Sequence, residues 1–355
     1  MGISDGDDAE KAEAPIRQRR RAGEQVRMTD VAARAGVSVM SVSRAIRDPE
    51  RVSPKIRARV EKAMRETGYV PNALASSLAS QRTRIIAAIV PFINASFGDT
   101  IRGITDVLHP SGYELLIGET GHSMQVEERL TDAFLSHRVD GLLLTGHSHT
   151  QGVRERLQNL KVPVVETWNL TERPMDQIVG FSNYEAARAM TRYLIGQGRR
   201  HIGYLGGITK DNDRATDRER GYIDEMTAAD LPCDRSLRSY RKLEFRHGGE
   251  GCEELLERHP DIDAIFAASD MLAVGALFRC IKRGIAVPDD IAIAGFDDSD
   301  ISSAIHPALT TVRVPRYEMG SRAAQMLLQR LDTDEETYGQ KVVDLGFEIL
   351  IRDST

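Results

Sequence analysis

Residues 28–83 read MTDVAARAGVSVMSVSRAIRDPERVSPKIRARVEKAMRETGYVPNALASSLASQRT, and this stretch decides how the N-terminal part of the chain folds. Thr29 can cap a helix that carries Val31 and Ala35 on one face, and Gly36 follows where a helix end favours a positive φ. A second short helix comes directly afterwards. Two short helices joined by a turn that contains glycine predict a helix-turn-helix.

The second helix is expected from Val39 to Ile46, behind a Ser38 cap, and its first residues would enter the major groove of DNA. Val39 and Met40 are apolar and suit thymine methyl groups, whereas Val42 is expected in the core of the domain. Serine and arginine side chains in the same helix can bind phosphates and set the register. The DNA-binding candidates here are Thr29, Ser38, Val39, Met40, Ser41, Ser43 and Arg44.

A third helix is expected to begin at Ser53 and Pro54 and to end at Gly68. Asn72 can then cap a last helix at 73–79, which is too short to be stable alone in water. We therefore expect this segment to become helical only when two copies pack together on DNA. A simple linker is the alternative.

The charge of the chain is divided unevenly between its two ends. Residues 17–84 carry 16 Lys and Arg against six Asp and Glu, a local charge of +10, within a chain whose net charge is −6. The remainder therefore carries −16. A basic end on an acidic body is typical of a nucleic-acid-binding module attached to a larger domain. The basic run 17–21 can add weak phosphate contacts, or it can be a solvated tail without a role.

From Arg84 onward, apolar runs alternate with amphipathic segments. Ile85–Val90 is continuously apolar, as a parallel strand covered on both faces should be. Further strands are expected at 114–117, 141–144, 162–165, 201–205, 264–267 and 291–295, and helices at 97–108, 126–136, 184–197 and 271–283. This alternation predicts an α/β fold with doubly wound parallel sheets, in which ligands bind beyond the carboxyl ends of the strands.

Three motifs connect these features: TDVAARAGVSVMSVSRAI at 29–46, VSPKIRARVEKAMRETGYVPN at 52–72 and NALASSLA at 72–79. They resemble the headpiece of the lactose/galactose repressor (LacI/GalR) family, and the resemblance extends to about residue 352. It implies a two-lobe core resembling periplasmic sugar-binding proteins. Within the family, the strings VDGLLLT, VGFSNYEAARAMT and VPDDIAIAGFDD resemble the gluconate-operon repressor type.

The resemblance implies a division into domains. A disordered tail would occupy 1–26, the helix-turn-helix headpiece 27–70, and the hinge helix with its linker 71–83. The effector-binding and dimerisation core would occupy 84–355. Its first lobe would comprise about 84–181 and 312–330, and its second lobe about 182–311 and 331–355.

The family also implies a mechanism. A homodimer would place two headpieces on the half-sites of a near-palindromic operator, and Leu78 would push into the minor groove at the centre. Asn72 and Ala75 would belong to the same DNA-binding hinge. An effector in the cleft between the lobes would change the angle between them, and the hinge helices would then separate and release the DNA.

Candidate effector-binding residues follow strands or open helices around the expected cleft. Asp297 in GFDDSD and Asp270 in AASD lie at strand ends, where a carboxylate can accept from sugar hydroxyl groups. A helix cap or loop ion pair is the alternative for each, and we favour it for Asp270. Arg218 occupies the position of the family's sugar-binding arginine. The remaining candidates are Asn94, Ser96, Phe97, His149 at the rim of the cleft, and Trp168, which can stack on a sugar or pack in the core.

The expected ligand is a sugar acid. Arg316 follows the crossover LTTVRVP, at a position where the lactose-type pattern has an aromatic residue. Arg218 and Arg316 are natural partners for a carboxylate, because a guanidinium pairs with it in a bidentate way. We expect gluconate or a related sugar acid, with a neutral sugar or a phosphosugar as the alternatives.

Other classes of protein fit less well. A transport binding protein would need export and would lack the headpiece, and the chain has no apolar run long enough for a signal peptide or a membrane span. No motif of a hydrolase, kinase or dinucleotide-binding enzyme is present. His147 and His149 lack an identifiable third ligand, so we expect neither a metal nor another cofactor. These observations predict a cytoplasmic regulator that is not an enzyme.

Overall fold

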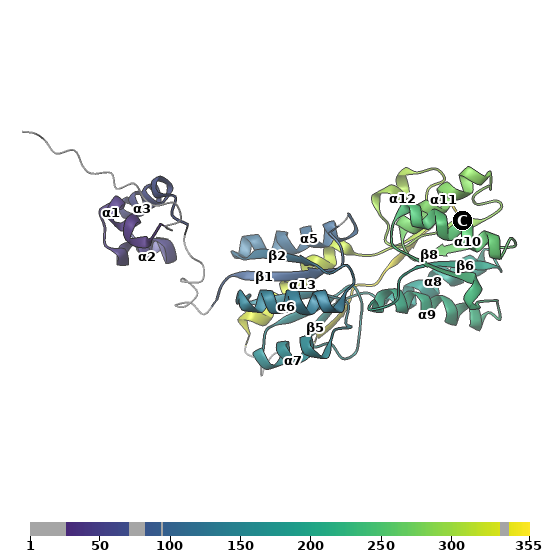
Figure 1. The fold of residues 1–355 in the computed structure, drawn as a ribbon, viewed down its shortest axis with the longest axis horizontal. Helices are drawn as coiled ribbons and strands as arrows, with labels where there is room; N and C mark the ends of the chain where they lie inside the picture. The colour runs from purple at the N-terminus through teal and green to yellow at the C-terminus, as the bar shows by residue number, and fades with distance from the viewer. Residues whose placement is uncertain (1–25, 71–81, 94, 334–340) are drawn as a thin grey trace, which may run out of the picture. The chain divides into compact units, whose positions relative to one another are not determined.

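The computed structural model describes residues 26–70, 82–93, 95–333 and 341–355, and it divides the chain into two units that meet between Thr83 and Arg84 (Figure 1). The predicted core begins at the same boundary. Almost all of the predicted tail at 1–26 lies outside the described residues. So does the predicted hinge helix.

The described residues of the first unit form three α-helices and one 3₁₀ helix. They are α1 (Met28–Ala35), α2 (Val39–Arg47), η1 (Pro49–Arg51) and α3 (Pro54–Thr67). Their buried apolar residues form one small core, to which each α-helix contributes: Val31, Ala32, Ala35, Val42, Val60 and Ala63. Gly36 ends α1 at φ 63°, and Gly68 ends α3 at φ 67°. Both glycines therefore take the left-handed conformation that closes a helix.

The start of α1 differs from the prediction. The helix begins at Met28, so Thr29 lies inside its first turn and is not the capping residue. The backbone N–H of Arg27 instead donates to the Asp30 carboxylate at 2.8 Å. Asp30 is the third residue of the helix, and its carboxylate satisfies the backbone N–H of the residue before the helix. Its negative charge also suits the positive end of the helix dipole.

The second unit has two lobes, each built on a parallel sheet (Figure 1). In lobe one the strand order is β11-β5-β4-β3-β1-β2, and all the pairings are parallel. The strands are β1 (Ile85–Val90), β2 (Glu114–Glu119), β3 (Gly141–Thr145), β4 (Val164–Thr167), β5 (Gln177–Gly180) and β11 (Lys341–Asp344). The helices are α5 (Ala95–Leu108), α6 (Met124–Ser136), α7 (Gln151–Leu160) and α13 (Arg316–Asp332), with η2 (His109–Ser111) after α5.

Lobe two has a four-stranded parallel sheet in the order β7-β6-β8-β9. The strands are β6 (Ile202–Gly207), β7 (Arg238–Arg241), β8 (Ala264–Ala267) and β9 (Ala292–Ala294). The helices are α8 (Asn183–Gly196), α9 (Asp213–Ala228), α10 (Phe245–Arg258), α11 (Asp270–Arg283) and α12 (Asp300–Ala304), with η3 (Arg235–Leu237) before β7. The predicted α/β class with doubly wound parallel sheets is confirmed.

The lobes are joined by crossing segments rather than by a single linker. β10 (Thr311–Arg313) and β12 (Glu348–Leu350) form an antiparallel pair where the chain crosses between the lobes. The predicted lobe boundaries need one correction here. Residues 331–355 were assigned to lobe two, but β11 pairs with β5, so residues 341–344 belong to the sheet of lobe one. The run KVVD is short and largely exposed, because it forms the edge of that sheet.

The helices α5 and α13 pack against each other through two glycines. A Cβ atom at Gly320 would overlap the backbone oxygen of Thr100, and one at Gly103 would overlap that of Tyr317. The hydroxyl of Thr100 donates to the backbone oxygen of Arg316 at 3.1 Å. The two helices therefore lie backbone against backbone over the sheet of lobe one.

Three further features of the described residues concern membrane spans, thiols and metals. Within the ranges that the structure describes, no helix is long and apolar enough to cross a membrane. Cys252 and Cys280 are buried free thiols whose sulfur atoms lie 3.9 Å apart between α10 and α11. The same ranges contain no group of three or more His, Cys, Asp or Glu side chains arranged to hold a metal ion.

Candidate nucleic-acid interface and ligand pocket

The first turn of α2 presents the predicted DNA-reading residues to solvent. The side chains of Val39 and Met40 are 41% and 71% exposed, whereas Val42 is fully buried, as predicted. The hydroxyl of Ser38 accepts from the backbone N–H of Ser41 at 3.1 Å and so caps the helix. The exposed end of a helix-turn-helix is thus apolar at two successive positions.

The other candidates of the headpiece share this surface only in part. Thr29 and Arg44 are exposed, and Ser41 and Ser43 are half-buried. The hydroxyl of Ser41 also lies 2.9 Å from the hydroxyl of Ser38. It is therefore already hydrogen-bonded to the residue that caps the helix. The hinge candidates Asn72, Ala75 and Leu78 lie outside the described residues.

An inner pocket lies between the carboxyl ends of the two parallel sheets. Its volume is about 60 Å³, and it adjoins an outer groove of about 750 Å³. The two spaces share six lining residues: Phe92, His122, Gly207, Asn212, Leu243 and Met271. The predicted candidates Phe97, Trp168, Arg218 and Asp297 all line the inner pocket. A pocket at the ends of parallel strands, with a few charged groups among apolar and aromatic side chains, is a candidate ligand site.

Arg218 and Asp297 form the buried ionic part of this pocket. Arg218 donates from Nε to the side-chain oxygen of Asn183 and from Nη1 to the backbone oxygen of Ala268, both at 2.7 Å. Its Nη2 lies 3.6 Å from Oδ1 of Asp297, and its guanidinium lies 3.7 Å from the ring centre of Phe296. Arg218 is therefore already held on three sides.

Asp297 is held in an unusual position. Its φ is 108°, a conformation that L-residues adopt rarely and at a cost of about 1–3 kcal/mol. Burial raises the pKa of its carboxyl above the ordinary value, although the neighbouring arginines, led by Arg218, act against that rise. Its Oδ1 is buried and accepts no hydrogen bond within the described part of the chain. A ligand hydroxyl could donate to it.

Trp168 and Phe97 supply the aromatic wall. Their ring centres are 4.5 Å apart and their planes are tilted by 34°. Trp168 has φ 69°, and its backbone N–H donates to the sulfur of Met319 at 3.1 Å. Both side chains are buried yet line the pocket, so the two readings of Trp168, as a core residue and as a pocket residue, both apply.

Asp270 does not line the inner pocket. Its Oδ2 accepts from the backbone N–H of Ser299 at 2.6 Å, and its Oδ1 accepts from the hydroxyl of Thr311 at 2.6 Å. The carboxylate thus ties the start of α11 to the loop after β9 and to β10. Burial, with the charge of Asp297 adding to it, raises the pKa of Asp270 to about 7. The structural role favoured for this residue agrees with these contacts.

His149 lies inside lobe one and not at the rim where it was expected. Its Nδ1 is 2.7 Å from Glu127 and its Nε2 is 3.3 Å from Glu166, and its side chain has no exposed surface. Although burial lowers the pKa of His149, the hydrogen bond to Glu127 and the negative charges of both glutamates outweigh burial and raise it to about 9. Sequence spacing could not show this, because the two glutamates come from α6 and β4.

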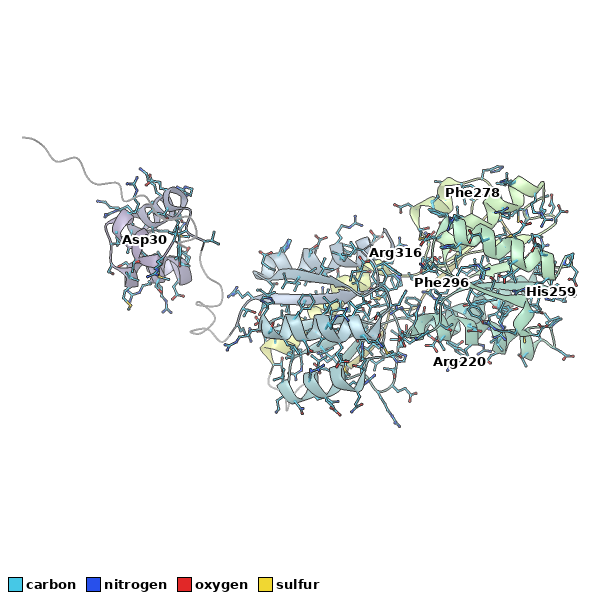
Figure 2. The ribbon with its side chains drawn as sticks, viewed as in Figure 1. Asp30, Arg220, His259, Phe278, Phe296 and Arg316 are labelled. Carbon is cyan, nitrogen blue, oxygen red and sulfur yellow. The ribbon has the colours of Figure 1, made fainter. Side chains whose placement is uncertain are left out.

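Arg316 also differs from its predicted place. It does not line the inner pocket; its Nη1 donates to the backbone oxygen of Asp297 at 2.6 Å, and its Nη2 lies 3.1 Å from the Asp99 carboxylate. Figure 2 shows Arg316 where the two lobes meet. Arg316 therefore connects α5 of lobe one to the pocket loop of lobe two. Asn94 lies outside the described residues, and the side chain of Ser96 is likewise not described.

The structure adds pocket residues that the sequence analysis missed. Arg214, His122 and Asn212 line the inner pocket, and Arg214 is as buried as Arg218. A signal was present in the sequence: Arg214 and Arg218 are four residues apart in α9, and side chains with that spacing share a helix face. His122 and Asn212 lie in loops that carried no such pattern.

Together, an exposed helix-turn-helix and a separate two-lobe unit with a polar pocket define a ligand-responsive DNA-binding protein. Residues 27–72 match the family described as bacterial regulatory proteins, lacI family, and residues 191–355 match the periplasmic binding protein-like domain. The HTH-type transcriptional regulator GntR of Escherichia coli K12 is 36% identical over 91% of this chain and 96% of its own. The chain belongs to the lacI family of transcriptional regulators, which are not enzymes.

Solved structures agree with this assignment. A LacI-family transcriptional regulator from Silicibacter pomeroyi matches with a TM-score of 0.85 at 31% identity, over 93% of this chain and 99% of its own. The transcription regulator GntR from Chromobacterium violaceum matches with a TM-score of 0.71 at 37% identity, over 76% and 98%. The lac repressor dimer bound to operator, at 23% identity and a TM-score of 0.78, shares the fold over 94% and 99%.

Proposed function

We propose that the protein is a cytoplasmic homodimeric repressor whose hold on a near-palindromic operator is controlled by gluconate or a related sugar acid. The observation that carries this proposal is the inner pocket, which combines Arg214, Arg218 and Asp297 with the aromatic pair of Phe97 and Trp168. Charged hydrogen-bonding groups beside an aromatic wall suit a polyhydroxylated acid. The 36% identity to GntR supports the same class of transcriptional regulator.

The contacts of Arg316 suggest how the pocket could act on the rest of the core. Asp297 lines the pocket, and its backbone oxygen accepts from Arg316, which also pairs with Asp99 in α5. A ligand that moves the Asp297 loop must therefore break these bonds or move α5 with it. The resulting change between lobes is the proposed signal, and ligand and operator affinities must be coupled reciprocally.

A second copy of the chain is proposed to cover part of lobe two. Phe278 and Ile281 lie three residues apart on α11, and they are 51% and 54% exposed. Residues with this spacing share one helix face, so the two side chains form an apolar patch. Figure 2 shows Phe278 on the outer side of its lobe. Apolar patches on a surface mark places where another chain binds.

The test of the proposed function is operator binding by the full-length protein with and without D-gluconate. We expect gluconate to change the affinity for operator DNA by about fivefold or more, in line with typical coupling energies. D-Glucose and glucose 6-phosphate serve as the neutral and phosphorylated comparisons. If none of these sugars alters operator binding, the proposal of a sugar-type effector fails.

The predicted hinge and the dimer are tested separately. Leu78→Gly is expected to weaken operator binding, because it removes the side chain proposed to enter the minor groove. Phe278→Asp should weaken the dimer, measured by sedimentation equilibrium, because it puts a charge into an apolar interface. Leu160→Asp is the matched control, since Leu160 is 61% exposed on α7 of lobe one. If Phe278→Asp, Leu160→Asp and the wild type show the same dimer dissociation constant, the proposed interface is contradicted.

A further inference from the structure

Arg214 differs from Arg218 in the pocket and from Arg316 beside it because part of its guanidinium is buried without a hydrogen bond. Its side chain is 9% exposed, and its Nη1 has no hydrogen-bond partner among the described residues. Arg218 and Arg316, by contrast, donate to backbone and side-chain oxygens. A buried charged donor without a partner is costly, so its presence in a pocket needs an explanation.

The neighbours of Arg214 leave its Nη1 without a hydrogen-bond acceptor. The nearest carboxylate oxygen, Oδ1 of Asp213, is 3.7 Å from Nη1, beyond hydrogen-bonding distance. That carboxylate already accepts from the backbone N–H groups of His147 at 2.7 Å and of Arg214 itself at 2.9 Å. Asp213 therefore serves mainly as an anchor between the lobes, where it holds the start of α9 against the loop after β3.

His122 faces Arg214 from lobe one without adding an opposing charge. Its Nδ1 lies 3.5 Å from Nη2 of Arg214. Burial, together with the charge of Arg214, lowers the pKa of His122 to about 4, so the ring is neutral at pH 7. A neutral nitrogen can accept from Arg214 but cannot neutralise it. Among the charged side chains that line the inner pocket, Arg218 is paired with Asp297. The carboxylate beside Arg214, that of Asp213, is not part of the lining and leaves Nη1 without an acceptor.

We propose that Arg214 binds the acidic group of the ligand, a carboxylate or a phosphate, and thereby makes the pocket select acidic sugars over neutral ones. This inference rests on the proposed function and replaces Arg316 as the expected partner of the acid. Arg214 lies one turn before Arg218 in α9, so the ligand would span both. Its acidic group would accept from Nη1 of Arg214, and a hydroxyl group would donate to the buried Oδ1 of Asp297.

The pocket contains its own reporter of binding. Trp168 is the only tryptophan of the chain, and it lines the inner pocket. Intrinsic fluorescence of the full-length protein can therefore follow titration with D-gluconate, its neutral analogue D-gluconamide and glucose 6-phosphate. We expect the wild type to bind gluconate or glucose 6-phosphate, whichever acid fits, at least tenfold more tightly than gluconamide.

The variants then assign this preference to one residue. Arg214→Gln should weaken binding of the preferred acid roughly tenfold to hundredfold, the effect of losing a hydrogen bond to a charged group, and should leave gluconamide binding nearly unchanged. Arg214→Lys keeps the charge and should retain part of the preference for the acid. Arg220→Gln is the matched control, because Arg220 lies in the same helix, is 59% exposed and does not line the pocket (Figure 2).

Different results overturn the inference and the proposed function. If wild type and Arg214→Gln prefer the acid equally, or if gluconamide binds the wild type as tightly as gluconate does, Arg214 does not select the acid. In either case a sugar could still release the operator, and the proposed regulator would stand. If Arg214→Gln fails to fold, judged by thermal unfolding, Arg214→Lys and the comparison of the two ligands on the wild type decide the matter. If no sugar binds or alters operator binding, the proposed function fails first.

Discussion

At the tip of α2, Val39 and Met40 hold apolar side chains in solvent, while in the inner pocket Arg214, Arg218 and Asp297 hold charges away from it. Folded proteins usually bury apolar side chains and expose charged ones. The tip of α2 departs from this rule by exposing apolar side chains, and the inner pocket departs from it by burying charges. The exposed apolar tip costs the headpiece little, because its small core lies elsewhere. The buried charges affect the stability of the whole core, because their removal would leave other buried groups unpaired.

Arg218→Ala gives the largest expected effect on this comparison. The change leaves Asp297 without its charged partner and leaves the side chain of Asn183 and the backbone oxygen of Ala268 without their donor. Breaking a buried pair in this way costs about 3–5 kcal/mol. The midpoint temperature of unfolding of the core should therefore fall, which calorimetry measures. A core that unfolds as the wild type does would show that the pocket charges are not essential to the fold.

His149→Gln tests a buried charge that has its partners inside the protein. The folded pKa of about 9 lies above the unfolded value of 6.5, so the ion pairs stabilise the fold below pH 6.5. This contribution is lost as the pH rises through 9. It amounts to no more than about 3.5 kcal/mol, because the two pKa values differ by about 2.5 units at 1.4 kcal/mol per unit. Denaturant unfolding at pH 6 and pH 9.5 should show that the substitution is costly only at pH 6.

Met40→Ala should weaken DNA binding without affecting the fold, in contrast to the substitutions of buried charges. Met40 is mostly exposed, so its truncation should leave the unfolding of the headpiece nearly unchanged. If its side chain is buried against a base on binding, the loss of apolar contact should weaken operator affinity by about 1–2 kcal/mol. Fluorescence anisotropy with labelled operator measures this change. Unaltered affinity, with the salt dependence of binding also unaltered, would remove Met40 from the interface.

Ser38→Ala has the smallest expected effect. It removes the cap that accepts from the backbone N–H of Ser41, a loss of about 1 kcal/mol or less for an exposed helix end. The loss should appear in the headpiece alone, because the core is a separate unit. Amide hydrogen exchange of the two units would show this. Equal loss of protection in both units would mean that they do not unfold independently.

The sequence predicted the headpiece well, because local signals decide its structure. Gly36, the Ser38 cap and the burial of Val42 all follow from spacing within a few residues. The strands of the core were found where they are continuously apolar, as in Ile85–Val90. β7 was missed because its sequence RSYR is polar. β5 was also missed: its sequence QIVG begins with a polar residue, whereas the equally short β8, AIFA, is apolar throughout and was predicted.

The pocket was only partly predictable, because its contacts join distant segments. Strand ends pointed to Asp297 and the family resemblance pointed to Arg218, and both residues line the inner pocket. The sequence could not show that Arg316 is bound to Asp99, 217 residues earlier in the chain, and therefore already occupied. Nor could it show that Arg214 is left with an unsatisfied nitrogen. Whether an arginine is available depends on its neighbours in space, which spacing along the chain does not reveal.

The glycines between α5 and α13 have a consequence for how a signal could travel. At Gly103 and Gly320 the two helices touch through their backbones, so at these two positions no side chain separates them. Arg316 is the first residue of α13. A displacement of Arg316 from the cleft should therefore move α13 and α5 together. Larger residues at either glycine would force the helices apart and should uncouple sensing from release while leaving the two ends intact.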